Sequence, residues 1–502
     1  MNKRRLIGLI VLTLFATWLA LRGCVREPEP PPPPPEPTRE AFHAARALRA
    51  SVSVGSAAES EGSEFAWLDR ELRHLLLRGQ MRLAMPASAA SAFELRVALT
   101  EDGKEAQLQL IAPDGVVERE QSISLGASRL EAAQALASTL PAFLDASHAS
   151  AEWSSFIGTQ DQRAYDTYIR AANELLGASS QGLTRPTASR TRTRTVERLE
   201  SLTRAQPKYA RAWAVLAIAY LSMGGEDVVS LTDLAESAAE RALLLDDALA
   251  EAHAALGIVD LRRNEWIAAE ERLGRALTLD ADLASAAEGL ACLYADSGHV
   301  KRSLRHAESA VALQPRNAGA NECLTYARIA SGADIFAEEF VPISSIARVQ
   351  ALAAFLQGDT RGAERLLRRT IPRAEFEIWA APTLQAASNR RLIPEALKAI
   401  TQAANNGYID ASTEILCGAA LKQPEFVFNR IARLAREDSS TPLRVFWLPN
   451  ADFLRKHPRF EEAMGDAGLF AFWHSSGPPD ICTREPGVYG CNVKGNVVEP
   501  RG

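Results

Sequence analysis

The chain has 502 residues, a formal net charge of −6 and a sequence pI near 5.9. This acidic balance argues against a nucleic-acid-binding protein, because such proteins present a positive face to the phosphate backbone. The length allows two or three domains with substantial cores. Aromatic residues make up only 7% of the chain while hydrophobic residues make up 47%, a balance that suits closely packed helices with small side chains between them.

The amino terminus predicts export. Lys3, Arg4 and Arg5 precede an uncharged run, residues 6–21, that is slightly shorter than the ~17–25 residues of a spanning helix. A cationic flank stays in the cytoplasm, so the rest of the chain is expected on the other side of the membrane. We interpret residues 1–24 as a signal anchor or a lipoprotein signal of a bacterial inner membrane.

Two alternatives remain for the attachment to the membrane. Residues 21–24 read Leu-Arg-Gly-Cys, which resembles the box of bacterial lipoproteins, with Cys24 as the residue that would be lipidated. Arg22 occupies the place of a small residue in that box, and this departure favours an uncleaved, single-pass anchor. In both cases the proline-rich linker, residues 25–40, would act as a stiff spacer between the bilayer and a periplasmic body.

Residues 41–150 predict a small α/β domain. Alternating apolar residues indicate strands, helical spacing of leucines indicates helices, and residues 101–104 (Glu-Asp-Gly-Lys) predict a hairpin turn. The expected strands are Ser51–Val54, Phe93–Leu99, Ala106–Ile111 and Val116–Leu125, and the expected helices are Glu64–Arg78 and Leu130–Leu144.

A repeated pattern occupies residues 160–335. Leu256, Leu290 and Leu324 recur at intervals of 34 residues, with small and large residues at fixed positions between them. This period and order resemble the tetratricopeptide (TPR) repeat, in which each repeat is a pair of antiparallel helices. The resemblance implies a superhelix in which stacked pairs share a continuous core.

The pattern weakens towards the carboxyl end. Gly358-Asp359 predicts the turn of a further helix pair, and Ala396 recurs 33 residues after Ala363. We expect divergent pairs over residues 336–440. The expected fold is therefore mostly α: a TPR superhelix preceded by a small α/β domain and an N-terminal membrane segment.

A polar insertion, Ser179–Thr195, interrupts the array near its start. It contains Arg190, Arg192 and Arg194 but no aromatic residues that could stack on nucleic-acid bases. We expect a solvated loop here and no nucleic-acid partner.

Two further segments resemble one group of proteins. Residues 164–171 read Ala-Tyr-Asp-Thr-Tyr-Ile-Arg-Ala, and residues 453–482 contain His-Pro-Arg-Phe, Gly-Leu, Trp and Pro-Asp-Ile-Cys in that order. With the α/β layout and the repeats, they resemble the periplasmic part of CadC/ToxR-like membrane regulators and TPR-bearing adenylate cyclases, in which a TolB amino-terminal-like domain precedes the TPR array. Those proteins carry a DNA-binding or cyclase output domain on the cytoplasmic side, whereas only residues 1–5 precede the expected membrane segment here, so any signalling is expected to pass through a partner.

Cysteine positions predict one disulfide. Cys482 and Cys491 frame a short loop in the C-terminal segment, residues 441–502, and an oxidising compartment would favour their pairing. A metal site that adds His474 is less favoured, because the three residues match no common ligand spacing. Three other cysteines fall within expected helices and are expected to be small, buried apolar residues: Cys292, Cys323 and Cys417.

No motif indicates chemistry. The sequence contains no nucleotide-binding loop, zinc-protease helix or nucleophile elbow. Its eight histidines are scattered, without carboxylates or cysteines at ligand spacing beside them. We therefore expect no cofactor, no metal and no catalytic residue.

The concave face of the array is the predicted binding site, because the second, fifth and ninth positions of each first helix face it in a TPR pair. The ninth positions form an apolar stripe: Ile218, Ile258, Cys292 and Tyr326. The polar positions are Arg211, Glu251, Glu288 and Glu322. Such a groove suits an extended or helical partner segment with apolar anchors and a basic residue. The alternative is that the stripe is covered by Ser179–Thr195 or by the C-terminal helices.

Together these patterns predict a membrane-tethered periplasmic scaffold or signalling adaptor that binds a protein partner in its TPR groove and has no catalytic activity. Two alternatives stay open. One is a lipoprotein that assists envelope assembly or secretion. The other is a small-ligand sensor or enzyme that uses the 41–150 domain.

Overall fold

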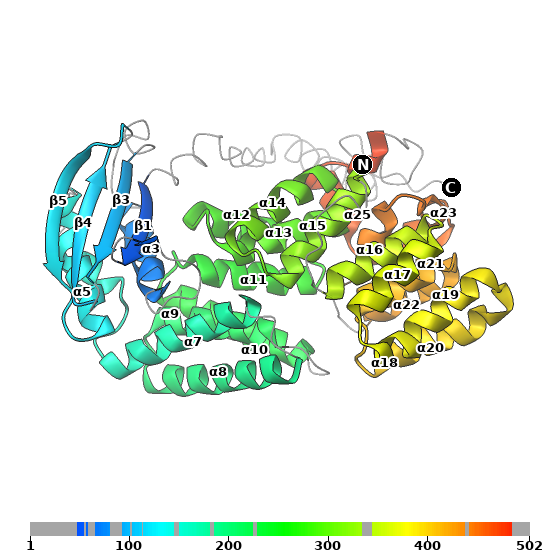
Figure 1. The fold of residues 1–502 in the computed structure, drawn as a ribbon, viewed down its shortest axis with the longest axis horizontal. Helices are drawn as coiled ribbons and strands as arrows, with labels where there is room; N and C mark the ends of the chain where they lie inside the picture. The colour runs from blue at the N-terminus through cyan, green and yellow to red at the C-terminus, as the bar shows by residue number, and fades with distance from the viewer. Residues whose placement is uncertain are drawn as a thin grey trace, which may run out of the picture.

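Figure 1 shows the fold, which comes from a computed structural model. The structure describes residues 48–54, 57–58, 66–80, 93–100, 103–112, 114–144, 150–180, 185–223, 228–333, 344–436 and 441–483. The segments interpreted as a membrane signal (1–24, including Cys24) and as a linker (25–40) lie outside these residues. Within the described ranges, no helix is both long enough and apolar enough to cross a membrane.

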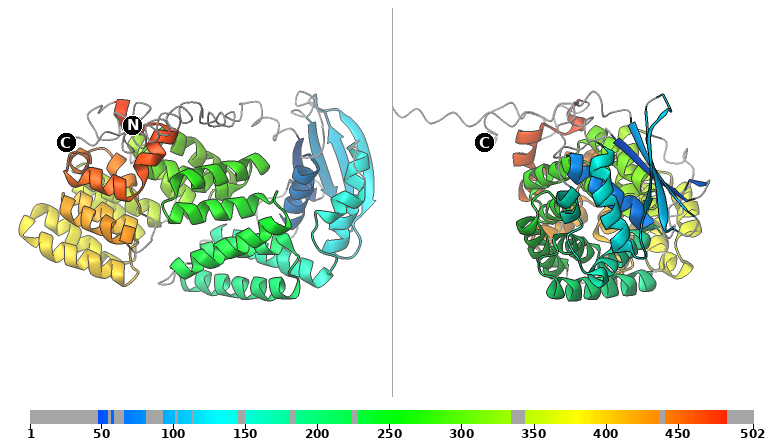
Figure 2. Two further views of the ribbon diagram at one scale, coloured as in Figure 1. Left: turned by 180° about the vertical axis from the view of Figure 1, so that it is seen from behind. Right: turned by 90° about the vertical axis from the view of Figure 1, so that its left-hand side faces the viewer.

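The first folded unit is a five-stranded sheet in the order β2-β1-β3-β4-β5, in which β1 runs parallel to β3 and the other neighbours are antiparallel. Its strands are β1 (Leu48–Val54), β2 (Ala57–Ala58), β3 (Phe93–Leu99), β4 (Glu105–Ile111) and β5 (Val117–Ser124). Helices α3 (Ala66–Gln80) and α5 (Arg129–Phe143) cover one face (Figure 2). Leu95, Val97 and Leu99 alternate towards that face and are buried, which is the pattern that predicted the strand.

Most of the molecule is helical, as predicted (Figures 1 and 2). After the short α6 (Ser150–Ser155), pairs of helices follow one another and pack side by side. They are α7 (Gln162–Ser180), α8 (Arg185–Ala205), α9 (Ala210–Ser222), α10 (Val228–Leu245), α11 (Ala250–Arg262), α12 (Trp266–Leu279), α13 (Ala284–Asp296), α14 (Val300–Leu313) and α15 (Ala318–Ser331). Helices α9, α11, α13 and α15 contact one another in turn and form one layer.

Close approach between helices in this array depends on Leu273 of α12. Its fully buried side chain lies between Gly257 of α11 and Gly289 of α13. A Cβ atom on Gly257 would lie 2.6 Å from Leu273 Cγ, and one on Gly289 would lie 2.9 Å from Leu273 Cδ2. Both distances are shorter than carbon atoms tolerate, so glycine at these two positions lets one leucine pack against two neighbouring pairs.

The expectation of a solvated loop at Ser179–Thr195 is wrong. Helix α7 continues to Ser180, and α8 begins at Arg185 and includes the rest of the stretch. The physical reason is the apolar face of α8 that begins where the predicted loop ends. Thr195, Val196 and Leu199 recur there at helical spacing and are buried. Because the first turns of α8 carry mainly arginine and threonine, the sequence resembles a loop although the helix is amphipathic.

The carboxyl half continues with more helix pairs. Its elements are α16 (Ser344–Leu356), α17 (Thr360–Thr370), α18 (Arg373–Glu375), the π-helical turn η1 (Phe376–Ala380), α19 (Ala381–Ser388), η2 (Arg390–Leu392), α20 (Ile393–Asn405), α21 (Ala411–Ala420) and α22 (Pro424–Arg436). The turn predicted at Gly358-Asp359 joins α16 to α17, and the Asp359 carboxylate accepts a hydrogen bond of 2.8 Å from the Gly362 N–H to cap α17.

The C-terminal segment folds back onto the middle of the array (Figure 1). It contains η3 (Arg444–Trp447), α23 (Asp452–Arg455), α24 (Arg459–Asp466), α25 (Leu469–Ser476) and η4 (Asp480–Thr483). It contacts the turns inside the pairs α11/α12 and α13/α14, where buried indole N–H groups donate hydrogen bonds to backbone carbonyls. From the C-terminal segment, Trp447 donates to Asp296 (2.8 Å) and Trp473 donates to Ser297 (2.9 Å). From the array, Trp266 donates to Ala467 of the C-terminal segment (2.5 Å).

Helix α3 attaches the α/β domain to the opposite edge of the array, where the loops between pairs lie. Arg211, at the start of α9, donates two hydrogen bonds of 2.9 and 2.8 Å to the carboxylate of Glu71. The two side chains are only 6% and 0% exposed. Two more ion pairs follow along α3: Arg73 with Asp282 (2.9 Å) and Arg78 with Asp246 (2.7 Å).

We expect loss of one partner of the buried pair to destabilise the fold strongly. Glu71→Leu leaves the Arg211 charge buried and unpaired, which costs about 3–5 kcal/mol of unfolding free energy. Joint replacement of Glu71 by Leu and Arg211 by Met should recover most of this loss, because no buried charge remains. Chemical denaturation of the single and double variants measures both effects.

The matched control is Glu364→Gln, which breaks the exposed ion pair between Glu364 and Arg368. Such surface pairs contribute about 0–1 kcal/mol. A loss after Glu71→Leu as small as the control's would contradict the role given to the buried pair.

Candidate functional site

The predicted groove residues lie on the layer formed by α9, α11, α13 and α15, but the chain itself covers part of this layer. Ile218 of α9 and Ile258 of α11 are half-buried and pack at the edge of the hydrophobic core. Glu251, at the start of α11, is also half-buried. These three residues keep the accessibility that a binding role requires.

Arg211 is a correction. It was expected to face the groove, whereas its guanidinium is buried against Glu71 and lies 4.7 Å from the ring centre of Tyr168. The partner carboxylate comes from α3, which is 140 residues away in sequence. A charge in the first turn of α9 is therefore used to dock the α/β domain.

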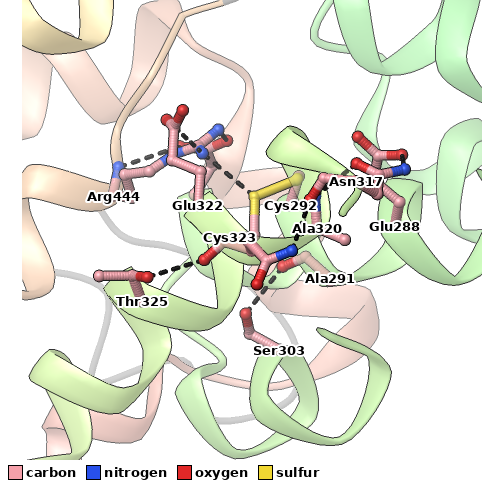
Figure 3. The surroundings of a disulfide bond; sticks show 12 residues. Glu288, Ala291, Cys292, Ser303, Asn317, Ala320, Glu322, Cys323, Thr325 and Arg444 are labelled. Carbon is pink, nitrogen blue, oxygen red and sulfur yellow. Dashed lines mark hydrogen bonds and ion pairs between the residues drawn. A yellow bond between two sulfur atoms is a disulfide. The ribbon is translucent and has the colours of Figure 1, made fainter. Parts of the chain in front are cut away.

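Cys292 and Cys323 are a second correction. They were expected to be separate apolar residues, and instead they form a disulfide that joins α13 to α15 (Figure 3). Their Cα atoms are 5.4 Å apart, which is within the usual range for a disulfide. Cys417 is free and buried, as expected. Cys482 is also in a disulfide, but Cys491 lies outside the described residues, so its pairing with Cys482 stays a prediction.

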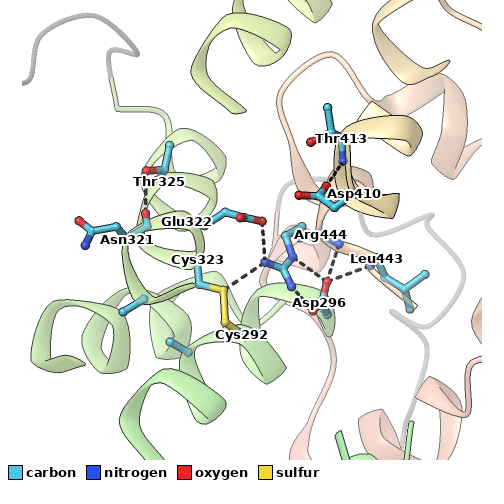
Figure 4. Close-up of polar contacts among 12 residues, drawn as sticks. Cys292, Asp296, Asn321, Glu322, Cys323, Thr325, Asp410, Thr413, Leu443 and Arg444 are labelled. Atoms are coloured by element: carbon cyan, nitrogen blue, oxygen red, sulfur yellow. Dashed lines mark hydrogen bonds and ion pairs between the residues drawn. A yellow bond between two sulfur atoms is a disulfide. The ribbon is translucent and has the colours of Figure 1, made fainter. Parts of the chain in front are cut away.

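Arg444 covers the far end of the stripe (Figure 4). Its guanidinium binds both carboxylate oxygens of Asp296 at 3.0 and 2.8 Å, and the same carboxylate accepts the backbone N–H groups of Leu443 and Arg444. The guanidinium also lies 5.4 Å from the ring centre of Tyr326, which is only 2% exposed. Tyr326, expected to contact a partner, is thus in contact with the C-terminal segment.

The two remaining acidic residues have partners within the chain. Glu288 accepts a hydrogen bond of 2.8 Å from the Asn317 amide, and burial raises its pKa. Glu322 lies 3.5 Å from the Arg444 guanidinium. Burial raises the pKa of Glu322 to about 7, although Arg444 opposes the shift. Glu322 is therefore only partly charged at neutral pH, and both carboxylates already have partners within the chain, so a basic residue of a partner would gain little there.

The structure thus brings Cys292, Glu322 and Tyr326 together around Arg444, and it leaves Ile218 and Ile258 apart from them. Sequence reasoning missed Asp296, Arg444 and Glu71, and no local pattern marks their long-range contacts. In the part of the chain that the structure describes, no group of three or more His, Cys, Asp or Glu residues is placed to hold a metal ion.

Comparison with protein families finds no family model that matches the chain, and comparison with curated proteins finds no match. The packing of successive helices is that of a helical-repeat array and is compatible with TPR repeats.

We expect the Cys292–Cys323 disulfide to stabilise the array. The two cysteines are 31 residues apart. Closing a loop of this length lowers the conformational entropy of the unfolded chain, which raises the unfolding free energy by about 3–4 kcal/mol. Replacing both cysteines by serine should lower the unfolding free energy by that amount, as measured by denaturant titration without reductant.

Reductant should lower the stability of the wild-type protein and of a Cys417→Ser control more than that of the double variant. A double variant as stable as the oxidised wild type would contradict a structural role for the disulfide.

We expect Glu322 to make stability depend on pH. Its folded pKa of about 7 lies above the usual value of 4.5 for a glutamate, so the folded state binds a proton that the unfolded state has lost. The stabilisation is present at low pH and is lost as pH rises through about 7. Glu322→Gln should match the wild type in melting temperature near pH 5 and exceed it at pH 8.

The exposed Glu461→Gln variant is the control and should follow the wild type at both pH values. If Glu322→Gln lowered the melting temperature equally at both, Glu322 would act as an ionised partner of Arg444 throughout.

Proposed function

We propose that the protein is a membrane-tethered periplasmic scaffold or signalling adaptor that binds a segment of a protein partner on α9 and α11, without catalytic activity. The observation that carries this proposal is the unequal covering of the stripe. Tyr326 is closed off by Arg444, whereas Ile218 and Ile258 remain half-buried on neighbouring helices. A partner segment with two apolar anchors would bury both isoleucines.

The charge near these isoleucines narrows the class of partner. Glu251 makes no hydrogen bond or ion pair with the rest of the described chain, and it lies on the same helix as Ile258. A basic residue next to the anchors would therefore find a carboxylate at the α11 end of the surface. The far acidic residues, Glu288 and Glu322, are already in contact with Asn317 and Arg444.

Disulfide bonding supports the proposed compartment. Structural disulfides form and persist in oxidising compartments such as the bacterial periplasm. Cys292, Cys323 and Cys482 are all disulfide-bonded. The alternative is a lipoprotein that assists envelope assembly or secretion. Metabolic labelling with a fatty-acid analogue, and its loss in Cys24→Ala, would separate it from a single-pass protein.

We expect a photo-crosslinking residue at position 218 or 258 to capture the same partner in cells. Ile258→Asp should then reduce recovery of that partner about tenfold or more, because the partner's apolar anchor would meet a charge at a cost of ~1.4 kcal/mol or above. Mass spectrometry of the crosslinked product identifies the partner.

Ile267 provides the matched control, since this isoleucine is 45% exposed on α12, outside the inner layer. Capture from position 267 that equals capture from 258 would contradict the proposed surface. Unchanged recovery after Ile258→Asp, with the circular dichroism spectrum intact, would contradict it as well.

A further inference from the structure

A cavity of about 50 Å³ lies between α3 and the loops that join successive helix pairs. Its walls include Arg70, Arg73 and His74 from α3 and Glu251 and Asp280 from the array. The cavity thus lies where the α/β domain meets the repeats. It does not include Ile218 or Ile258, but it shares Glu251 with the surface of the proposed function, so the response of Arg70→Gln to a ligand and the effect of Ile258→Asp on partner recovery test the two separately.

Most charges around the cavity are already paired. Arg73 binds Asp282, Arg78 binds Asp246, and Arg211 binds Glu71. The side chain of His74 contacts the Phe156 carbonyl at 3.0 Å, and burial lowers its pKa well below the usual value. His74 is therefore neutral, and among these groups only the Arg78 Nε atom is buried without a hydrogen-bond partner.

Two opposite charges remain unpaired. Among the described residues, Arg70 makes no hydrogen bond or ion pair, and its Nη1 atom is sealed from solvent. Glu251 on the facing wall also has no hydrogen-bonding or ion-pairing partner within the described ranges. They influence each other electrostatically but are not in contact. A guanidinium nitrogen that is sealed from solvent and has no acceptor is unfavourable, so a ligand that accepts a hydrogen bond from it would be bound strongly.

Asp280 adds a second carboxylate to the array side. One of its oxygens accepts a hydrogen bond of 3.0 Å from the Asp282 N–H, which leaves the other oxygen for a ligand. Burial raises the pKa of Asp280 to about 6, and the nearby charge of Glu251 adds to this effect. A cation placed between these two carboxylates would favour the ionised form of both.

We propose that this cavity binds the head group of a small free α-amino acid, with the ligand carboxylate on Arg70 and the ligand ammonium on Glu251 and Asp280. A phosphate or acetate would satisfy Arg70 but would be repelled by the two carboxylates, and a simple amine would leave Arg70 unpaired. A volume of about 50 Å³ holds roughly three to five waters, which is close to the five heavy atoms of the head group.

The neighbouring apolar residues indicate which side chain fits. The apolar part of the lining consists of Leu77 of α3 and, from the array, Ala248, Leu249, Ala250 and Leu279. We therefore expect glycine and L-alanine to fit the cavity, whereas the side chains of larger amino acids would have to project out of it. Because the carboxylate is held by α3 and the ammonium by the array, the amino acid would bridge the α/β domain and the repeats.

Thermal unfolding of the full-length protein tests the proposal. We expect 10 mM glycine or L-alanine to raise the melting temperature by about 2–4 °C, as a ligand that binds only the folded state does. Sodium acetate and methylammonium chloride at the same concentration should not. Arg70→Gln and Glu251→Gln should each abolish the response, and the exposed Arg361→Gln and Glu461→Gln controls should keep it.

Three results would overturn the proposal. A shift with acetate or phosphate equal to that with L-alanine would indicate a simple oxyanion site. The absence of any shift with amino acids would show that the cavity holds only water. Energetic coupling between Arg70→Gln and Glu251→Gln in the absence of ligand would show that the two side chains pair directly with each other in solution. Because Arg70 and Glu251 have no partner to lose, neither single variant should lower the melting temperature of the unliganded protein.

Discussion

The contact of Leu273 with Gly257 and Gly289 determines how closely three successive helices approach, and the rest of the structure depends on it. An array built in this way buries its core only between neighbouring pairs, so apolar surface remains wherever the stacking stops. The chain covers that surface with its own flanking segments. The α/β domain lies at one edge of the array, and the C-terminal segment lies at the other.

The two covers use different chemistry. Helix α3 is held by ion pairs, of which the one between Arg211 and Glu71 is almost completely desolvated. Such a pair contributes more to a defined orientation than to net stability. The C-terminal segment is held by hydrogen bonds from tryptophan N–H groups and by Arg444, whose guanidinium donates hydrogen bonds to the Asp296 carboxylate. Between these covers lie the exposed parts of α9 and α11, which form the surface on which we propose that a partner segment binds.

The sequence predicted the features that depend on local periodicity. Alternation at Leu95, Val97 and Leu99 gave the strand β3, and the 34-residue period at Leu256 and Leu290 gave the helix pairs. It failed where a contact is long-range. Glu71 and Arg211 are 140 residues apart, and no pattern in either segment refers to the other. The Cys292–Cys323 disulfide had a usable signal, since a separation of 31 residues is close to one repeat and places both cysteines on neighbouring helices.

Helix α11 takes part in both large hydrophobic cores. Ala255, Leu256 and Val259 belong to the core of the α/β domain and the first repeats, whereas Ala254 belongs to the core of the later repeats, and Ile258 packs against both. The two cores meet along α11, and we expect bending of the helical array to concentrate there. A partner bound at Ile258 would contact the place where the two cores meet and should restrict this bending. A narrower distribution of distances between spin labels on α8 and α20 would report the restriction.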